Sequence, residues 1–322
     1  MKTALIFPGQ GSQAVGMGKA LAERFSAAAA VFEEVDAALG EKLSRLIFEG
    51  PEAELTLTAN AQPALMATSM AALRALEAQA GFDVARDAAF VAGHSLGEYS
   101  ALCAAGALTL ADAAKLLRLR GRAMQQAVPA GEGAMAAILG LDFDKVSAIA
   151  LTAARDLYLT GAICEAANDN GGGQVVISGT KAAVERAMEL AKAAGAKRAL
   201  PLAVSAPFHC TLMTPAAEAM AEALARTAIA APKVPLVANV SALPLTDPAA
   251  IRESLVKQVT GTVRWRESVA YMAGQGVTRF VELGAGKVLA GLVKRIVEGA
   301  STVSVGAPAD VEAFKAGRAS LS

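Results

Sequence analysis

Histidine, cysteine and net charge are all scarce in this sequence. Its 322 residues include two histidines and three cysteines, and 30 basic residues balance 30 acidic ones. Because Cys103, Cys164 and Cys210 are scattered, they predict neither a disulfide framework nor a zinc site, and we expect no metal. Nucleic-acid-binding proteins carry a strong basic excess, so the zero net charge argues against nucleic acid as a partner.

Long apolar runs are also missing. No stretch approaches the ~18 uncharged apolar residues of a membrane span, and the apolar run in MKTALIFPGQ is too short for a signal peptide. We therefore expect a cytoplasmic protein that does not bind membranes. The hydrophobic fraction of 54% is ample for a sizeable core.

Three short apolar runs are each followed by a glycine turn and a helical pattern. The runs are TALIF, AFVAG and RFVEL, and the segments after them are PGQGSQ, HSLG and GAGK. Strand, tight turn and helix in this order predict an α/β fold with a parallel sheet. Binding sites in such sheets lie at the carboxyl ends of the strands, which makes the three turns candidate site segments.

The middle of the chain has a different order of elements. Strands are predicted in GAMAAILGL, GAICEAAND, GQVVISG and RALPLAV, with helices over 142–156 and 181–194. The resulting order, β-α-β-β-α-β, is ferredoxin-like. We therefore expect a small domain at residues 129–198, inserted into a larger α/β domain formed by residues 1–128 and 199–322.

The segment GHSLG, from Gly93 to Gly97, matches the pattern G-x-S-x-G between a strand and a helix. In a nucleophile elbow, the serine occupies a strained turn that exposes its hydroxyl, and the glycines let strand and helix pass closely. The N–H of Leu96 would then point at a developing oxyanion. Ser95 is accordingly a candidate nucleophile; the alternative is a serine that only shapes the turn.

A serine nucleophile usually requires a general base, most often histidine. His94 adjoins Ser95, but adjacent side chains diverge at a sharp turn, so we expect His94 to pack or hydrogen-bond beside the elbow. If Ser95 is a nucleophile, His209 is the base by elimination unless a lysine serves; otherwise it is a loop histidine without a role. No acidic residue stands out as its partner, and a backbone carbonyl could orient it instead.

One arginine lies on the apolar face of the helix predicted in TLADAAKLLRLRGRAMQQAV. At ~100° per residue, Arg120 falls in the middle of that face, whereas Arg118 and Arg122 fall on the opposite side and are predicted to be solvated. A buried arginine needs a partner. Arg120 therefore either forms an internal ion pair or receives a substrate carboxylate, which its planar fork binds at two points.

These segments together resemble the malonyl-CoA–acyl carrier protein transacylases of fatty acid synthesis. The matching segments, in order, are FPGQGSQ, GHSLGEYSAL, RG at Arg120, GQVVISG, PFHC, VRW and ELGAGKVL, and they cover nearly the whole chain. The resemblance implies an α/β-hydrolase-like large domain with a parallel sheet core and a ferredoxin-like small domain, in agreement with the order of elements.

The resemblance also implies a role for each matching residue. Ser95 would be the nucleophile and His209 its base. The backbone N–H groups of Gln10 and Leu96 would form the oxyanion hole. Arg120 would bind the malonyl carboxylate.

Other matching positions surround the histidine. The backbone carbonyl of Gln258 would orient His209, which would explain the missing acid. Phe208 would line the substrate pocket, where its bulk would leave little space for a branched acyl group. The segment AANDNGGGQ is longer than the turn often found there, so no substrate role is carried over to Asn168 or Asn170.

The implied reaction moves a malonyl group from malonyl-CoA to the phosphopantetheine thiol of acyl carrier protein through a malonyl-serine ester, without a cofactor. The alternatives are a polyketide-pathway acyltransferase, a serine esterase or thioesterase, and a nucleotide-binding module built on GQGSQ, which lacks the fingerprint glycines and a Walker lysine.

We expect a monomer. Acyl carrier proteins are acidic, so docking on this neutral chain would require a local basic patch. The candidate residues, which could equally be an ordinary solvated surface, are Lys181, Arg186, Lys197, Arg198, Lys287 and Lys294.

Overall fold

The computed structural model describes residues 2–204 and 206–319, which form a mixed α/β structure with two sheets. The larger sheet has the strand order β10-β9-β1-β2-β7-β8, and all its neighbours pair in parallel except β7 and β8. This sheet confirms the predicted α/β fold. Its strands are β1 (Lys2–Phe7), β2 (Phe90–Gly93), β7 (Leu236–Val237), β8 (Pro244–Leu245), β9 (Val277–Leu283) and β10 (Ser301–Val305).

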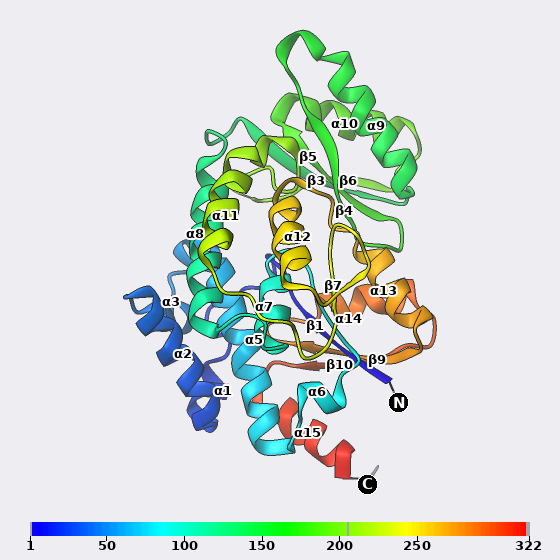
Figure 1. Ribbon diagram of the computed structural model, residues 1–322. Coiled ribbons are helices and arrows are strands. Elements are labelled where there is room, and N and C mark those ends of the chain that lie inside the picture. Colours follow the sequence, from blue (N-terminus) through cyan, green and yellow to red (C-terminus); the bar gives the residue numbers. More distant parts are fainter. Residues whose placement is uncertain (1, 205, 320–322) are drawn as a thin grey trace.

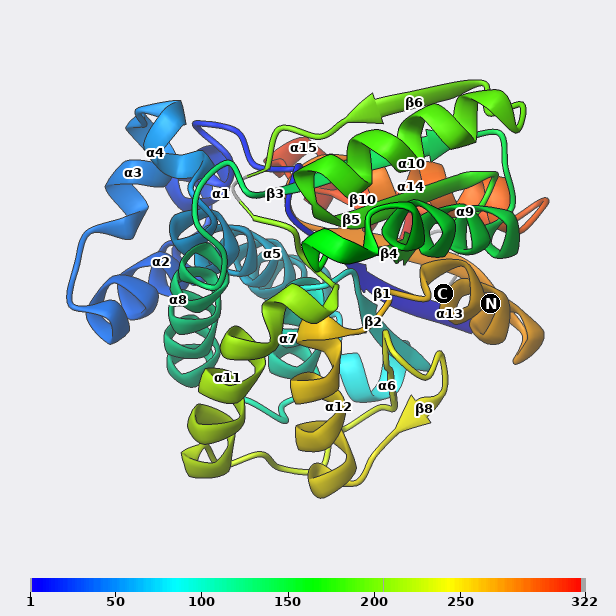
Figure 2. The ribbon, with the colours of Figure 1, turned by 90° about the horizontal axis from the view of Figure 1, so that it is seen from above.

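The second sheet is antiparallel and has the order β4-β5-β3-β6. It contains the strands β3 (Gly133–Leu139), β4 (Cys164–Asp169), β5 (Gln174–Thr180) and β6 (Arg198–Pro201). Its helices are α9 (Phe143–Asp156) and α10 (Lys181–Ala193), with a short turn η1 (Tyr158–Thr160). Figures 1 and 2 show this sheet and its two helices stacked on one side of the larger part. The predicted order of strands and helices in this stretch is confirmed.

The remaining helices belong to the larger part. They are α1 (Lys19–Arg24), α2 (Ser26–Leu39), α3 (Leu43–Glu49), α4 (Glu52–Thr56), α5 (Thr58–Ala80), α6 (Val84–Asp87), α7 (Gly97–Ala104), α8 (Leu110–Gln126), η2 (Thr211–Met213), α11 (Thr214–Arg226), α12 (Pro248–Thr260), α13 (Trp265–Gly274), α14 (Val288–Ile296) and α15 (Pro308–Ala319). In the part of the chain that the structure describes, none of the helices combines the length and apolar character needed to cross a membrane.

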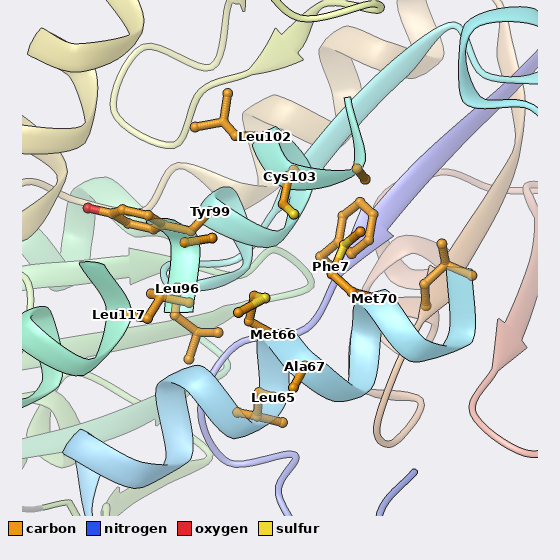
Figure 3. Close-up of a cluster of buried hydrophobic side chains, with 14 of the residues drawn as sticks. Phe7, Leu65, Met66, Ala67, Met70, Leu96, Tyr99, Leu102, Cys103 and Leu117 are labelled. Atoms are coloured by element: carbon orange, nitrogen blue, oxygen red, sulfur yellow. The ribbon is translucent and has the colours of Figure 1, made fainter. Parts of the chain in front are cut away.

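Strand β1 is buried on both faces. Leu5 and Phe7 belong to the core formed with α2, α5, α7 and α8, whereas Ala4 and Ile6 pack in a second core with α13 and α14. Figure 3 shows Phe7 among side chains of α5 and α7. Burial on both sides of a parallel sheet explains why TALIF is a continuous apolar run rather than an alternating one.

The antiparallel sheet presents different residues to its two sides. Ala136 and Ile138 pack in the core under α9 and α10. Met135 and Ala137 alternate with them, belong to the core of the larger part, and line cavities at the carboxyl ends of β1 and β2. The candidate site therefore lies between the two sheets.

Candidate active site

Ser95 sits in the turn between β2 and α7 with a backbone φ of 54°, in the left-handed region that side chains rarely adopt. A Cβ on Gly93 would lie 1.9 Å from the carbonyl group of Gly97, and a Cβ on Gly97 would lie 2.3 Å from the carbonyl oxygen of Phe7. Only glycine fits at both positions. The strained turn predicted from GHSLG is therefore present, and it brings the Ser95 hydroxyl to the cavity between the sheets.

His209 reaches this serine from the loop after β6. Its Nε2 lies 2.7 Å from Ser95 Oγ, while its Nδ1 lies 2.9 Å from the carbonyl oxygen of Gln258 and 3.1 Å from that of Gly261. Because two carbonyl oxygens face Nδ1, that nitrogen carries the proton and Nε2 is left to accept the serine hydroxyl. No carboxylate is needed to set this tautomer.

Burial controls the charge of His209. The residue is 3% exposed, and its desolvation, helped by the nearby positive charge of Arg120, lowers the pKa of His209 to about 3. The imidazole is therefore neutral at physiological pH, which is the form that can accept a proton.

His94 points to different partners. Its Nε2 lies 2.9 Å from Oδ1 of Asn170, and its ring centroid lies 5.8 Å from that of Trp265. It hydrogen-bonds beside the elbow, as the sequence predicted. Asn168 and Asn170 are both buried, and Asn168 lines the cavity that contains Ser95.

Arg120 is 1% exposed and points at the serine. Its Nη1 donates to Oε1 of Gln62 at 2.9 Å, and its Nη2 donates to Oε1 of Gln258 at 2.8 Å and to Ser95 Oγ at 3.1 Å. Among the described residues, no carboxylate forms an ion pair with Arg120, and its Nε has no acceptor. A buried guanidinium beside a nucleophile, bonded only to neutral groups, is suited to receive an anionic substrate group.

The prediction that Arg118 is solvated is wrong. Arg118 is 7% exposed, pairs with Glu41 and Asn60, and donates to the carbonyl oxygen of Ala59 at 2.7 Å. Helix α8 packs against α2 and α5 as well as α11, so more than one of its faces is covered. Arg122 is exposed, as expected.

Two neighbouring cavities lie at this site, and Ser95 lines the first of them. The first, of about 260 Å³, is lined by Gln10, Ser95, Met135, Phe208 and His209 among others. The second, of about 230 Å³, shares Gln10 with the first and extends along α14.

The two candidate oxyanion donors lie at the start of α7 and just after β1. Leu96 immediately precedes the first residue of α7, and Gln10 follows β1, the strand that pairs with β2. Within residues 2–204 and 206–319, neither backbone N–H donates to another group of the chain. Both donors are thus available to a ligand.

The candidate basic residues differ in their surroundings. Arg186 forms ion pairs with Asp156 at 2.9 Å and with Glu189 at 3.2 Å, so two carboxylates already offset its positive charge. The other five, Lys181, Lys197, Arg198, Lys287 and Lys294, are exposed. Lys287 and Lys294 flank the segment of α14 that lines the second cavity.

Sequence reasoning missed Asn239, which holds the elbow in place. This fully buried residue follows β7, the strand beside β2. Its Oδ1 accepts from the backbone N–H of Ser95 at 2.8 Å, and its Nδ2 donates to the carbonyl oxygen of Gly93 at 2.7 Å. An asparagine directly after an apolar run at the carboxyl end of a strand was the signal that could have found it.

Known proteins resemble this chain over nearly its whole length. Residues 4–314 match the family described as "Acyl transferase domain". The chain is 50% identical over 311 residues to the malonyl CoA-acyl carrier protein transacylase of Bacillus subtilis, covering 97% of this chain and 95% of that one. It is 48% identical to the transacylase of the same name from Escherichia coli K12, covering 96% and 97%.

Solved structures are equally similar. The acyl-carrier-protein-S-malonyltransferase of Bartonella henselae has a TM-score of 0.94 and 57% identity, with 98% of both chains covered. A malonyl-transacylase solved in complex with a type II polyketide acyl-carrier protein has a TM-score of 0.93 and 44% identity, with 98% of this chain and 100% of that chain covered.

Proposed function

This chain belongs to the acyl transferase domain family, and from the site we infer that it transfers the malonyl group of malonyl-CoA to acyl carrier protein through an ester on Ser95. It is a malonyl-CoA:acyl carrier protein S-malonyltransferase that supplies fatty acid synthesis. The observation that carries the proposed site is that Ser95 Oγ lies 2.7 Å from a neutral imidazole nitrogen and 3.1 Å from a nitrogen of the buried Arg120 guanidinium, which has no carboxylate partner among the described residues.

In the first half-reaction, the Ser95 oxygen attacks the thioester carbonyl carbon of malonyl-CoA while its proton passes to Nε2 of His209. The backbone N–H groups of Gln10 and Leu96 stabilise the tetrahedral oxyanion. When the carbon–sulfur bond breaks, the proton moves from His209 to the departing thiolate of coenzyme A. Arg120 binds the malonyl carboxylate at the other end of the acyl group.

The second half-reaction runs the same steps toward a different thiol. The phosphopantetheine thiol of acyl carrier protein gives its proton to His209 and attacks the ester carbon. The tetrahedral intermediate then collapses, the ester bond to Ser95 breaks, and the proton returns to the serine oxygen. The carbonyl of Gln258 keeps the imidazole in the tautomer that both steps need, and Phe208 bounds the acyl pocket.

The geometry favours acyl transfer over the esterase alternative. An esterase of the elbow type uses an acid to orient its histidine, whereas Nδ1 of His209 faces two backbone carbonyls. A buried cation beside the nucleophile also serves an anionic acyl group better than a neutral ester.

We propose that the larger part, residues 1–128 and 199–322, is α/β-hydrolase-like and that the inserted part, residues 129–198, is ferredoxin-like. The elbow after β2 supports the first assignment, and the order β4-β5-β3-β6 with two helices on one face supports the second. Because β6 runs from Arg198 to Pro201 and pairs with β3, we move the C-terminal boundary of the proposed inserted part from residue 198 to residue 201. We further propose that the protein is cytoplasmic and that it is a monomer. Sedimentation at several concentrations would test the oligomeric state.

A single experiment tests the proposed chemistry. Wild-type protein is mixed with malonyl-CoA, quenched in acid and digested, and the peptide that contains Ser95 is weighed by mass spectrometry. We expect a malonyl adduct on that peptide and none in Ser95→Ala, because the substitution removes the only atom that bonds to the acyl group. An adduct that persists in a folded Ser95→Ala protein would overturn the assignment.

A further inference from the structure

One buried carboxyl group beside the site has no role in the steps above. Glu98, in the first turn of α7, is 0% exposed. Its Oε2 accepts from Nε2 of Gln258 at 2.6 Å, and its Oε1 has no hydrogen-bond partner among the described residues. A buried carboxylate with an unsatisfied oxygen is costly, so its presence calls for an explanation.

The side chain of Gln258 joins this carboxyl group to Arg120. Its Oε1 accepts from Arg120 Nη2 at 2.8 Å, while its Nε2 donates to Glu98 and also to the carbonyl oxygen of Ser95 at 2.8 Å. The amide thus stands between a cation and an acid, and it holds them apart. A direct ion pair would have occupied the fork of Arg120.

We propose that Glu98 is the internal counter-charge of Arg120, and that it takes up a proton when an acyl group with its own carboxylate enters the site. This proposal rests on the proposed function, because it requires Arg120 to bind the malonyl carboxylate. Glu98 is a positioning and specificity residue, since it acts through Gln258 and Arg120 rather than on the substrate.

The charges around Glu98 favour its protonation when a second carboxylate enters the site. Among the described residues, its electrostatic partners are Arg120 on α8 and Tyr99 beside it on α7, and His209 on its loop interacts in turn with Arg120. With the site empty, one buried cation faces one buried anion. A malonyl carboxylate adds a second anion, and the excess negative charge is removed most simply by protonating the carboxyl group that is already poorly solvated.

The acid strength of Glu98 allows this proton uptake near neutral pH. Burial raises the pKa of Glu98 to about 7, against the smaller opposing effects of Gln258, Asn239 and Arg120. Above that pH the empty enzyme holds Glu98 ionised, and malonyl binding must draw a proton from solvent. Below that pH, Glu98 is already neutral, so Arg120 can bind the malonyl carboxylate without any proton uptake by Glu98.

The expected effect follows from Coulomb's law. Two hydrogen bonds and an amide separate Glu98 from Arg120, and one more hydrogen bond separates Arg120 from the malonyl carboxylate, so the two anions would lie roughly 9 Å apart. At that distance and an effective dielectric constant of about 20 to 40, a negative charge on Glu98 lowers the affinity for the malonyl group by about fivefold to twentyfold. Because the pH range of the test covers most of the titration of Glu98, a change of at least about fourfold is expected.

The test compares kcat/KM for acylation by malonyl-CoA and by acetyl-CoA in wild type and Glu98→Gln. The range from about pH 5.5 to 8.5 brackets the titration of Glu98 and keeps His209 neutral. In wild type the malonyl-to-acetyl ratio should fall at least about fourfold as pH rises through this range. In Glu98→Gln the ratio should stay at the wild-type low-pH value throughout.

Two controls separate this inference from its alternatives. Glu282 is also fully buried with a pKa raised by burial to about 7, but it accepts the backbone N–H groups of Leu289 and Ala290 at the start of α14. In Glu282→Gln, the malonyl-to-acetyl ratio should depend on pH as it does in wild type. Arg120→Ala should give a low ratio at every pH; if it leaves the ratio unchanged, the carboxylate clamp itself is wrong.

Two results would overturn the role of Glu98 while leaving the proposed function intact. One is a wild-type ratio that does not vary with pH, and the other is a Glu98→Gln ratio that falls as in wild type. If Glu98→Gln does not fold, proton uptake by wild-type protein decides the question. Acylation by malonyl-CoA near neutral pH should take up more protons per acyl-enzyme than acylation by acetyl-CoA, and equal uptake would refute the proposal.

Discussion

Replacing Arg120 with alanine perturbs both stability and specificity, and the structure separates the two effects. The substitution removes the bonds to Gln62, Gln258 and Ser95. The two amide oxygens are then left buried without that donor, at a cost of about 1–3 kcal/mol each in unfolding free energy. We therefore expect a lower Tm, which by itself would affect all substrates alike.

The effect on specificity concerns only acyl groups with a carboxylate. Removing one side of a desolvated charge pair costs roughly 2–5 kcal/mol, which corresponds to about 30-fold to several-thousand-fold in kcat/KM for malonyl-CoA. Acetyl-CoA has no carboxylate and escapes this loss. The malonyl-to-acetyl ratio should therefore collapse in Arg120→Ala, and Arg120→Lys should restore little of it, because an ammonium cannot reproduce the two-point fork.

The assay is the initial rate of acyl transfer from each thioester to acyl carrier protein, with circular dichroism to establish that both variants are folded. Taking the ratio of kcat/KM for malonyl-CoA to that for acetyl-CoA cancels any general loss of active protein. If Arg120→Ala slows malonyl-CoA and acetyl-CoA equally, Arg120 supports the fold of the site and does not bind the carboxylate.

Two further predictions concern the base and the carrier protein. His209→Ala should lower transfer by several orders of magnitude, whereas His94→Ala should have a smaller effect through the packing of the elbow; stopped-flow acylation rates of folded variants would measure both, and equal losses would contradict the geometry. We propose that acyl carrier protein docks on exposed basic residues such as Lys287 and Lys294, so transfer to it should weaken as salt rises, more than acylation by malonyl-CoA does. A second half-reaction insensitive to salt would refute the basic patch.

The elements that were predictable from sequence are those fixed by local pattern. The turn around Ser95 follows from two glycines at set positions, and β1 follows from a continuous apolar run. The pairing of Ser95 with His209 was reachable because the chain offers only one other histidine. In each case a short segment, or simple elimination, contains the information.

The residues that were missed depend on contacts between distant segments. Asn239 bonds to Ser95 across 144 positions of sequence, and Gln62 bonds to Arg120 across 58. No periodicity marks such residues. Arg118 was placed wrongly for the same reason, since the helical pattern of α8 identifies its most apolar face but not how many neighbouring helices will cover the others.

The separation of Ser95 and His209 in the chain has a consequence for folding kinetics. The two residues are 114 positions apart, and the whole antiparallel sheet lies between them. Closing so long a loop costs entropy that local helix formation does not. Ser95 and His209 therefore meet only after the intervening part has folded and brought the loop of His209 next to the turn that follows β2. During refolding, helical circular dichroism should recover before acylation does, so activity reports the last long-range contact rather than the bulk of the secondary structure.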